Sequence, residues 1–298
     1  MQIQLDLRKT PLNLDHTLSC GQTFRWEKRG NCWIGVVSQT ALTIRHVDNT
    51  LQFKASSDCV NTGFIKRYFR LDDDLHAIYS EIAKDKHVRG AIRQFHGLRL
   101  VRQDPWECLI SYICATFKSI PAIKQMIRFL SARFGRPVAF DGQEFHTFPE
   151  AKALAGANLR DLKACKLGYR AVNVRETAKL VSSGKFDLES LRTMSYQEAK
   201  KMLLSLPGVG SKVADCVLLF SLDKLEAFPI DIWMKRVILE SYSQFLKSGF
   251  PERIRCTRSL SMRDYQTLYD FGRSYFGEYL GYAQEYLYHY KRCQAQLG

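Results

Sequence analysis

The stretch LPGVGSKVAD at residues 206–215 carries the local signals that decide the fold of this region. A helix ending at Leu206 is stopped by the proline, and the two glycines can take backbone conformations that other residues avoid. A second helix begins near Ser211, where free backbone N–H groups and the positive end of the helix dipole form an anion site. The stretch therefore predicts a phosphate-binding hairpin between two helices, although an ordinary glycine-rich turn has the same pattern.

Lys212 stands in the first turn of the second helix, where the helix dipole disfavours its positive charge. A neutral lysine amine is a nucleophile that can form a Schiff base with a sugar carbon. Taken alone, Lys212 fits a solvated or phosphate-pairing lysine better. Nineteen residues later, FPID at residues 228–231 puts Asp231 at the start of another helix, where an acid caps the backbone. Two such helix starts can bring the amine and the carboxylate into one cleft.

Outward from the hairpin, the apolar residues keep a helical period from Asp72 to near the C-terminus. Asp104 and Pro105 resemble the cap and first residue of a helix, and Pro121 begins another that ends near Gly135. Residues 1 to about 60 instead alternate polar and apolar side chains, which is typical of strands. Further helices are expected over about 150–164, 168–183, 195–205, 211–222, 231–246 and 264–296.

This order of elements predicts an α+β fold. An N-terminal domain, residues 1–98, holds an antiparallel β-sheet with helices, and a larger all-α domain, residues 99–298, holds the hairpin. A length of 298 residues fits two domains, at about 100 to 200 residues for each.

The charge balance predicts a polyanionic partner. The chain has 44 Lys and Arg against 30 Asp and Glu, a formal net charge of +14, which favours nucleic acid or an anionic membrane surface. The most apolar stretch, residues 216–222, is far shorter than the about 20 residues of a spanning helix. The N-terminal residues do not have the pattern of a secretory signal. We therefore expect nucleic acid as the partner and no membrane.

Nine cysteines are dispersed along the chain with no C-x-x-C pair and no metal-like clustering. This spacing indicates reduced thiols in a reducing compartment, most of them small apolar core residues. We expect no metal and no other cofactor.

LPGVGSKVAD followed by FPID resembles the helix-hairpin-helix DNA glycosylase superfamily. Three more motifs resemble its 8-oxoguanine DNA glycosylase branch: SCGQTFRW at residues 19–26, RQDPWEC at 102–108 and LGYR at 167–170. The five motifs span nearly the whole chain in the order of that branch. Relatives that act on oxidised pyrimidines or adenine mispairs often hold a four-cysteine iron–sulfur loop, but near the C-terminus this chain has only Cys256 and Cys293.

The resemblance implies catalytic roles for two residues and a phosphate site at two more. Lys212 would displace the damaged base by attacking the anomeric carbon of its sugar. Asp231 would stabilise the positive charge that develops on the sugar and assist proton transfers. The backbone of Gly208 and Gly210 would hold a phosphate of the damaged strand.

It also implies a pocket for the flipped base. Gly21 would offer its carbonyl to the N7 hydrogen that 8-oxoguanine has and guanine lacks. Cys216, one helical turn beyond Lys212, would lie against one side of the base. Gln284 would bind the Watson–Crick edge, and Tyr288 would stack on the base. A plain turn glycine and a core thiol are the simpler interpretations of Gly21 and Cys216, and some tyrosines near Tyr288 must only pack.

The residues expected to contact the rest of the duplex match those of the family less closely. Tyr169 would wedge into the stack that the base has left, and Arg170 would face the orphaned cytosine. Phe117 stands where the branch has an asparagine that enters the gap, and Ala122 where it has an arginine that contacts cytosine. An aromatic ring can fill the gap but cannot hydrogen-bond cytosine, so discrimination of the opposite base is in doubt. Trp233 replaces a histidine, which puts a phosphate contact in doubt.

The function expected from these residues is that of a bifunctional DNA glycosylase/AP lyase. It would excise 8-oxoguanine from duplex DNA through a Schiff base in base excision repair, as a monomer bound to damaged double-stranded DNA. It would work in the nucleoid or the nucleus, according to the host. A glycosylase for another damaged base and a non-catalytic helix-hairpin-helix DNA-binding protein remain as alternatives.

Overall fold

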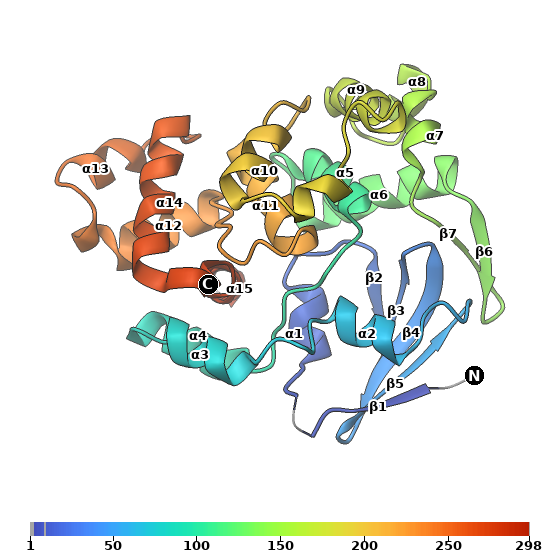
Figure 1. The fold of residues 1–298 in the computed structure, drawn as a ribbon, viewed down its shortest axis with the longest axis horizontal. Helices are drawn as coiled ribbons and strands as arrows, with labels where there is room; N and C mark the ends of the chain where they lie inside the picture. The colour runs from blue at the N-terminus through green and yellow to red at the C-terminus, as the bar shows by residue number, and fades with distance from the viewer. Residues whose placement is uncertain (1–2, 9, 298) are drawn as a thin grey trace.

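The computed structural model describes residues 3–8 and 10–297. A five-stranded sheet and its helices form one end of the molecule, and a larger helical body forms the rest (Figure 1). Both parts confirm the predicted α+β fold. All neighbouring strands are antiparallel, in the order β1-β5-β4-β3-β2. The strands are β1 (Ile3–Asp6), β2 (Trp26–Arg29), β3 (Cys32–Val37), β4 (Thr40–Val47) and β5 (Thr50–Ala55).

Two short helices cover one face of this sheet, α1 (Leu14–Ser19) and α2 (Thr62–Tyr68). The indole N–H of Trp26 donates to the hydroxyl of Tyr68 at 2.8 Å, which joins β2 to α2 inside a buried apolar cluster. The side chain of Asn13 caps α1 by accepting from the backbone N–H of His16. Because α1 ends one residue before Cys20, it delivers the chain directly into the turn at Gly21.

A second, two-stranded sheet pairs β6 (Pro137–Phe140) with β7 (Gln143–His146). Phe140 packs in one buried cluster with Ile34, Val36 and Ala41 of the five-stranded sheet. The hairpin was not among the elements expected from the sequence. It brings a part of the chain beyond residue 99 onto the N-terminal sheet.

The helical body follows the predicted order with several changes. The expected helix over 150–164 is two helices separated at residues 156–158, and that over 264–296 is interrupted at Gly277, where φ is +77°. The helices are α3 (Leu75–Ile82), α4 (Lys86–Gln94), α5 (Pro105–Ala115), α6 (Ile120–Phe134), α7 (Ala151–Ala155), α8 (Leu159–Ala164), α9 (Arg170–Ser182), α10 (Tyr196–Leu203), α11 (Ser211–Ser221), α12 (Ile232–Ser241), α13 (Phe250–Arg255), α14 (Met262–Phe276) and α15 (Leu280–Leu297).

Apart from Cys20, Phe24 and Val101, the buried residues change from the sheet cluster to the helical cluster between Phe69 and Leu75, well before residue 98. Leu75, Ile78 and Ile82 of α3 belong to the core of the helical body, whereas the sheet cluster ends its continuous run near Phe69. Helices α3 and α4 also lie against α15, the last helix of the chain (Figure 1). A domain boundary at residue 98 stays a prediction, and the packing shows that α3 and α4 share the core of the second part.

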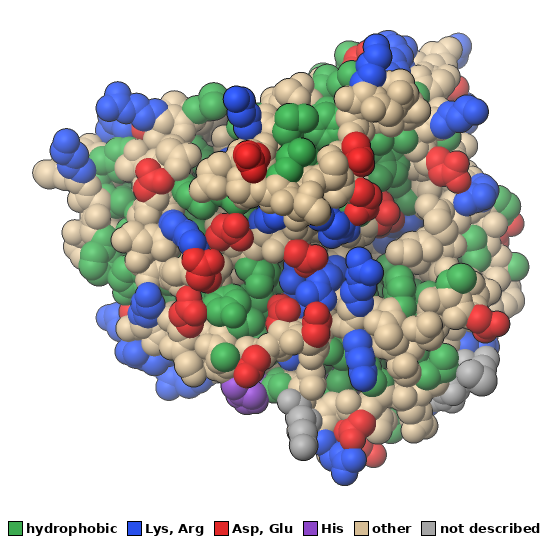
Figure 2. Space-filling view, in the orientation of Figure 1, with side chains coloured by type: hydrophobic (Ala, Val, Ile, Leu, Met, Phe, Trp, Pro, Cys, Tyr) green, Lys and Arg blue, Asp and Glu red, His purple; other side chains and the backbone are tan. Residues whose placement is uncertain are grey.

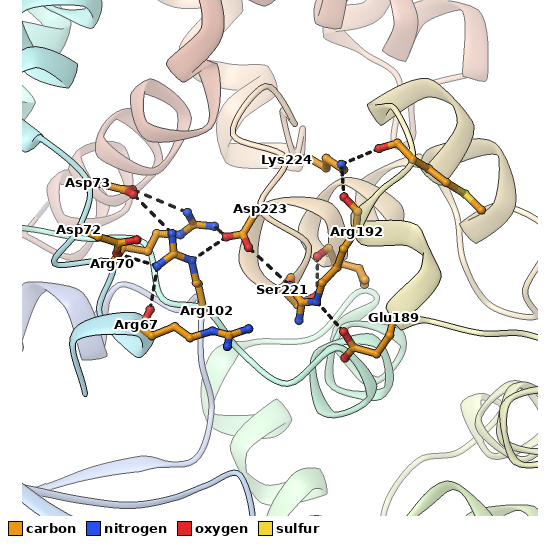
Figure 3. Close-up of polar contacts among 12 residues, drawn as sticks. Arg67, Arg70, Asp72, Asp73, Arg102, Glu189, Arg192, Ser221, Asp223 and Lys224 are labelled. Carbon is orange, nitrogen blue, oxygen red and sulfur yellow. Dashed lines mark hydrogen bonds and ion pairs between the residues drawn. The ribbon is translucent and has the colours of Figure 1, made fainter. Parts of the chain in front are cut away.

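A network of charged side chains fixes the C-terminal end of α11 to the N-terminal part (Figure 3). The carboxylate of Asp223, just beyond α11, accepts hydrogen bonds from Arg70 and, at 2.7 Å, from Arg102 Nε. The Arg70 side chain is only 1% exposed, and its buried guanidinium pairs with Asp223 and, at 3.7 Å, with Asp73. Arg192 donates to the Ser221 carbonyl at 2.6 Å and thereby joins the chain between α9 and α10 to the same helix end.

The surface seen in the same orientation is mixed in charge. Figure 2 shows acidic side chains between basic ones across the middle of this face, so the net charge of +14 does not form one continuous basic surface there. Within residues 3–8 and 10–297, no helix combines the length and apolarity needed to cross a membrane.

Candidate active site

The hairpin between α10 and α11 has the predicted form. Helix α10 ends at Leu203, slightly earlier than expected, and α11 begins at Ser211 as predicted. Gly208 has a φ of +81°, and a β-carbon there would lie 2.8 Å from the side chain of Asn173. Gly210 caps α11 with an ordinary φ of −98°, and a β-carbon there would meet nothing within 4 Å. Folding thus requires glycine at 208 but not at 210.

A buried carboxylate holds the two hairpin helices together. Asp215 of α11 accepts from the hydroxyls of Tyr196 at 2.8 Å and Tyr265 at 2.6 Å, and from Lys200 Nζ at 3.0 Å. Tyr196 and Lys200 belong to α10, and Tyr265 belongs to α14. The orientation of α11, and so of Lys212 in its first turn, is fixed by three hydrogen bonds from two neighbouring helices.

Lys212 lies beside an aromatic ring and a thiol. Its Nζ is 4.6 Å from the centre of the Tyr112 ring, at cation–π distance. Cys216 follows one turn later on the same face of α11 and is buried. Burial raises the pKa of the Cys216 thiol to about 12, although the charge of Lys212 opposes the rise. Cys216 is therefore a neutral, polarisable side chain at neutral pH.

Asp231 is the N-cap of α12, as the sequence predicted. One carboxyl oxygen, Oδ1, accepts from the backbone N–H groups of Trp233 and Met234, each at 2.9 Å. Burial raises the pKa of Asp231, and the hydrogen bond from Met234 and the charge of Lys212 oppose that rise. The cap bonds hold the carboxyl group in a fixed orientation at the pocket.

One pocket brings together six of the predicted site residues. Gly21 reaches it from the turn after α1, Lys212 and Cys216 from α11, and Asp231 from the start of α12. The complete lining is Gly21, Tyr112, Lys212, Cys216, Phe220, Pro229, Asp231, Gln284, Glu285 and Tyr288. A nucleophilic amine, a carboxylate, a backbone turn and aromatic rings thus face the same space.

The turn at Gly21 is held by its neighbour in the chain. Gly21 has a φ of +106°, which glycine adopts far more readily than other residues. The amide of buried Gln22 donates to the carbonyls of Thr17 at 2.9 Å and Arg99 at 2.8 Å, and accepts from the N–H of Val101 at 2.8 Å. The side chain of Gln22 thereby fixes the turn to the segment that leads into α5.

Helix α15 contributes two adjacent polar side chains to the pocket. Gln284 and Glu285 are 3% and 2% exposed, and the Oε1 atom of each has no hydrogen-bond partner within the described residues. Burial raises the pKa of Glu285 to about 7, against the lowering effects of Cys20 and Arg292. Buried polar atoms without partners are costly, so the wall from α15 is suited to a polar ligand.

The family follows from comparison with known proteins. Residues 4–109 match the family described as 8-oxoguanine DNA glycosylase, N-terminal domain. The chain is 31% identical over 298 residues to the N-glycosylase/DNA lyase OGG1 of Arabidopsis thaliana, covering 95% of this chain and 78% of that protein. The chain belongs to the 8-oxoguanine DNA glycosylase family. A probable N-glycosylase/DNA lyase of Methanothermobacter thermautotrophicus is also 31% identical, over 253 residues that cover 78% of this chain and 75% of the relative.

A solved structure extends this similarity to the whole fold. It is the Clostridium acetobutylicum 8-oxoguanine glycosylase/lyase in complex with double-stranded DNA that contains cytosine opposite 8-oxoguanine. The TM-score is 0.85 at 27% identity, and the alignment covers 99% of this chain and 98% of that one. The fold of this chain is therefore similar to that of the Clostridium enzyme over nearly its whole length.

Three residues predicted for duplex contacts, Phe117, Tyr169 and Arg170, lie on loops and a helix start outside the pocket. Phe117 and Tyr169 are 73% and 61% exposed, and Phe117 has a positive φ of +53°. Arg170 is buried beneath them. Its guanidinium lies 4.4 Å from the centre of the Tyr169 ring and donates to the Thr116 carbonyl. In this conformation Arg170 joins the loops that carry the two exposed rings, and a contact with cytosine stays a prediction.

Trp233 donates its backbone N–H to Asp231, and its ring lies 5.0 Å from the guanidinium carbon of Arg236. The ring is therefore engaged by a neighbouring cation on α12. A contact of Trp233 with phosphate is not required to explain its position.

Four lining residues of the glycosylase pocket were missed from sequence. Phe220 follows Cys216 by four residues on α11, so helical spacing could have found it. Glu285 is the only acid in α15, which could have marked it as unusual in a buried helix. Tyr112 and Pro229 carry no local signal, because they reach the pocket through tertiary packing.

Proposed function

We propose that this protein excises 8-oxoguanine from duplex DNA and then nicks the strand, with Lys212 as nucleophile and Asp231 as its acidic partner. The observation that carries the proposal is the pocket shared by Lys212, Asp231, Gly21, Gln284 and Tyr288. Names of relatives and neighbours support the reaction, since they include N-glycosylase/DNA lyase and 8-oxoguanine glycosylase/lyase.

The first chemical step breaks the bond between sugar and base. The neutral amine of Lys212 forms a bond to C1′, the C1′–N9 electron pair leaves with the base, and the base takes up a proton. Asp231 lies in the same pocket, where its carboxylate stabilises the positive charge that develops on the sugar. The cap bonds from Trp233 and Met234 hold it in place, so little reorganisation is needed.

The second step breaks the strand. Opening of the sugar ring leaves a protonated imine between Lys212 and C1′, which acidifies the hydrogen at C2′. Loss of that proton expels the 3′ phosphate by β-elimination. Water then hydrolyses the imine and frees the lysine. The same lysine thus serves both activities, which makes it the residue to test.

Recognition of the base uses opposite walls of the pocket. The carbonyl of Gly21 accepts the N7 hydrogen of 8-oxoguanine, and Gln284 binds the Watson–Crick edge through polar atoms that include its unpartnered Oε1. Tyr288 and Cys216 lie on the two faces of the base. Guanine lacks the N7 hydrogen and would leave a buried acceptor unpaired, which penalises it.

Binding of the duplex is assigned to the hairpin and to the exposed aromatic loops. The backbone at Gly208 and Gly210 is exposed and accepts a phosphate, while Phe117 and Tyr169 fill the gap left by the flipped base. The formal charge of +14 adds a non-specific attraction that weakens with salt. The protein would bind double-stranded DNA as a monomer, in the nucleoid or the nucleus.

The decisive experiment is borohydride reduction with a duplex that contains 8-oxoguanine. Wild type should form a covalent adduct with the lesion strand, and Lys212→Gln should form none. Lys179→Gln is the matched control, because Lys179 is an exposed lysine paired with Glu176 on α9. Equal trapping by Lys212→Gln and wild type would show that another amine is the nucleophile.

Product analysis separates the remaining alternatives. Release of free 8-oxoguanine identifies the lesion, and release of a different base from a panel of damaged duplexes would identify another substrate. A protein that retards the duplex in a gel but liberates no base would be a binding module and not a glycosylase.

A further inference from the structure

Arg292 of α15 holds the turn that presents Gly21. Its Nη1 donates to the carbonyl of Cys20 at 2.5 Å, and its Nη2 donates to the carbonyl of Ser19 at 2.8 Å. These are the two residues directly before Gly21. A β-carbon at Gly21 would lie only 2.8 Å from Nη1, so the guanidinium packs directly against the glycine backbone. The two bonds restrain the two peptide units directly before the one that carries the Gly21 carbonyl.

The same guanidinium also contacts a second residue that lines the pocket. Its central carbon lies 5.6 Å from the centre of the Tyr288 ring, at cation–π distance. Tyr288 lies one helical turn before Arg292 on α15. One side chain therefore contacts both the turn that would accept the N7 hydrogen and the ring that would stack on the base.

Glu285 completes this corner of the pocket. It lies on the same face of α15, seven residues before Arg292, and burial raises the pKa of its carboxyl group while the nearby Cys20 thiol and Arg292 both lower it. Arg292 supplies the favourable charge next to this buried acid. The Oε1 atom of Glu285 lacks a partner within the described residues although Glu285 lines the pocket. Helix α15 thus places a cation that bonds to the turn and a buried acid at the same corner of the pocket.

We propose that Arg292 is a positioning residue that sets discrimination between 8-oxoguanine and guanine, by fixing the Gly21 carbonyl relative to the Tyr288 ring. The proposal rests on the proposed function. The two bases differ at N7 by one hydrogen, so selectivity depends on an acceptor that cannot move away from guanine. Hydrogen-bond discrimination requires the acceptor to be held within about 0.5 Å. Two hydrogen bonds to adjacent carbonyls provide that restraint.

Elements other than Arg292 position Lys212 and Asp231. Among the described residues, Arg292 makes no hydrogen bond or ion pair with Lys212 or Asp231, whose positions are set by α11 and by the cap of α12. Cleavage at a preformed abasic site needs the amine but no base recognition. A loss of positioning should therefore separate base excision from strand cleavage.

The experiment compares Arg292→Lys and Arg292→Met with wild type in two assays. Single-turnover excision of 8-oxoguanine should fall about tenfold in Arg292→Met, and its preference over guanine should fall with it. Cleavage of a duplex with a preformed abasic site should change by less than about twofold. Arg292→Lys should recover part of the excision, because an ammonium group has donors but cannot match the planar fork to both carbonyls.

Lys291→Met is the matched control, since Lys291 is the adjacent cation and pairs with Glu240 at 2.5 Å, away from the turn. It should retain both activities. If the two Arg292 variants keep full excision and full preference for 8-oxoguanine, or lose excision and abasic cleavage equally, the proposal is wrong. If wild type cleaves the duplex with a preformed abasic site but does not excise 8-oxoguanine, the proposed substrate is wrong instead.

Discussion

The hydroxyl of Tyr112 donates at 3.0 Å to the carbonyl of Gln22, while the ring of the same residue lies 4.6 Å from Lys212 Nζ. Tyr112 thus joins the proposed nucleophile to the turn that presents Gly21. Its ring attracts the lysine ammonium by about 1–2 kcal/mol in a partly desolvated pocket. The hydroxyl contributes a separate hydrogen bond, so the two contacts can be tested separately.

Replacing Tyr112 tests whether the ring or the hydroxyl matters for catalysis. Tyr112→Phe should keep adduct formation near the wild-type rate and lose about 1 kcal/mol of unfolding free energy, because only the bond to Gln22 is lost. Tyr112→Leu should slow borohydride trapping about tenfold, because Lys212 loses the surface that positions it. Trapping rates and urea denaturation measure the two effects. Equal trapping by both variants would assign no role to the ring.

The hairpin glycines allow a matched pair of substitutions. Gly210→Ala should leave unfolding free energy unchanged, because φ is −98° and a β-carbon meets nothing within 4 Å. It should nonetheless weaken duplex binding, since the methyl group occupies the space where a phosphate would approach. Gly208→Ala should instead cost about 1–3 kcal/mol of stability, through its φ of +81° and its clash with Asn173. Unaltered DNA affinity in a folded Gly210→Ala protein would place the phosphate elsewhere.

Glu285 should make stability depend on pH. Its pKa is raised to about 7 in the folded protein, so folding favours the protonated acid. This contribution is fully present below the unfolded pKa of 4.5 and is lost as pH rises through about 7. Relative to Glu285→Gln, the free energy of unfolding of wild type should therefore fall by about 2–3 kcal/mol between pH 4.5 and pH 8. Urea denaturation at the two pH values measures it, and a constant difference would contradict the raised pKa.

Phe117 should determine how the opposite base is treated. Its exposed ring fills a gap by stacking and offers no hydrogen bond to cytosine, so excision opposite the four bases should differ by less than about threefold. Phe117→Ala should slow all four reactions by a similar factor of about ten, because base–aromatic stacking contributes about 1–3 kcal/mol. Single-turnover rates on four duplexes are the measurement. A strong preference for cytosine in wild type would contradict this interpretation.

The parts of the pocket that were predicted from sequence depend on local signals. The cap position predicts Asp231 and the hairpin predicts Lys212, whereas Cys216 is implied by the resemblance and lies one helical turn beyond Lys212. The resemblance added Gly21, Gln284 and Tyr288, which no local rule would have brought to the same space. Their convergence in one pocket depends on how α1 and α15 pack.

The features that the sequence did not predict are mainly contacts between residues far apart in the chain and elements of only a few residues. The Arg292 contact with Cys20 joins residues 272 positions apart, and no periodic pattern marks it. Helix α1 has six residues and the strands of the β6–β7 hairpin have four each, lengths over which periodicity is weak. The break at Gly277 was missed because the apolar pattern continues across it into α15.

Asp223 lies at the other end of α11, the helix that carries the proposed nucleophile Lys212. Burial alone would raise the pKa of Asp223, but Arg70 and Arg102 outweigh it and leave the pKa lowered. Asp223→Asn should lower the free energy of unfolding by about 1–3 kcal/mol, because the buried Arg70 loses a charged partner. The loss is smaller than for a fully buried pair, because the Asp223 side chain is 42% exposed to solvent. Asparagine tolerates the positive φ of +60°, so backbone strain is not added.

The lowered pKa of Asp223 determines how the effect of Asp223→Asn on stability changes with pH. A lowered pKa stabilises the fold above the unfolded value of 3.8, and the contribution is lost as pH falls through the folded pKa. The stability gap between wild type and Asp223→Asn should therefore be present at pH 7 and shrink towards pH 3. Asp72→Asn is the control, because Asp72 is 60% exposed and bonds only to Arg102 in this network. An equal gap at both pH values would mean that the charge of Asp223 does not anchor α11.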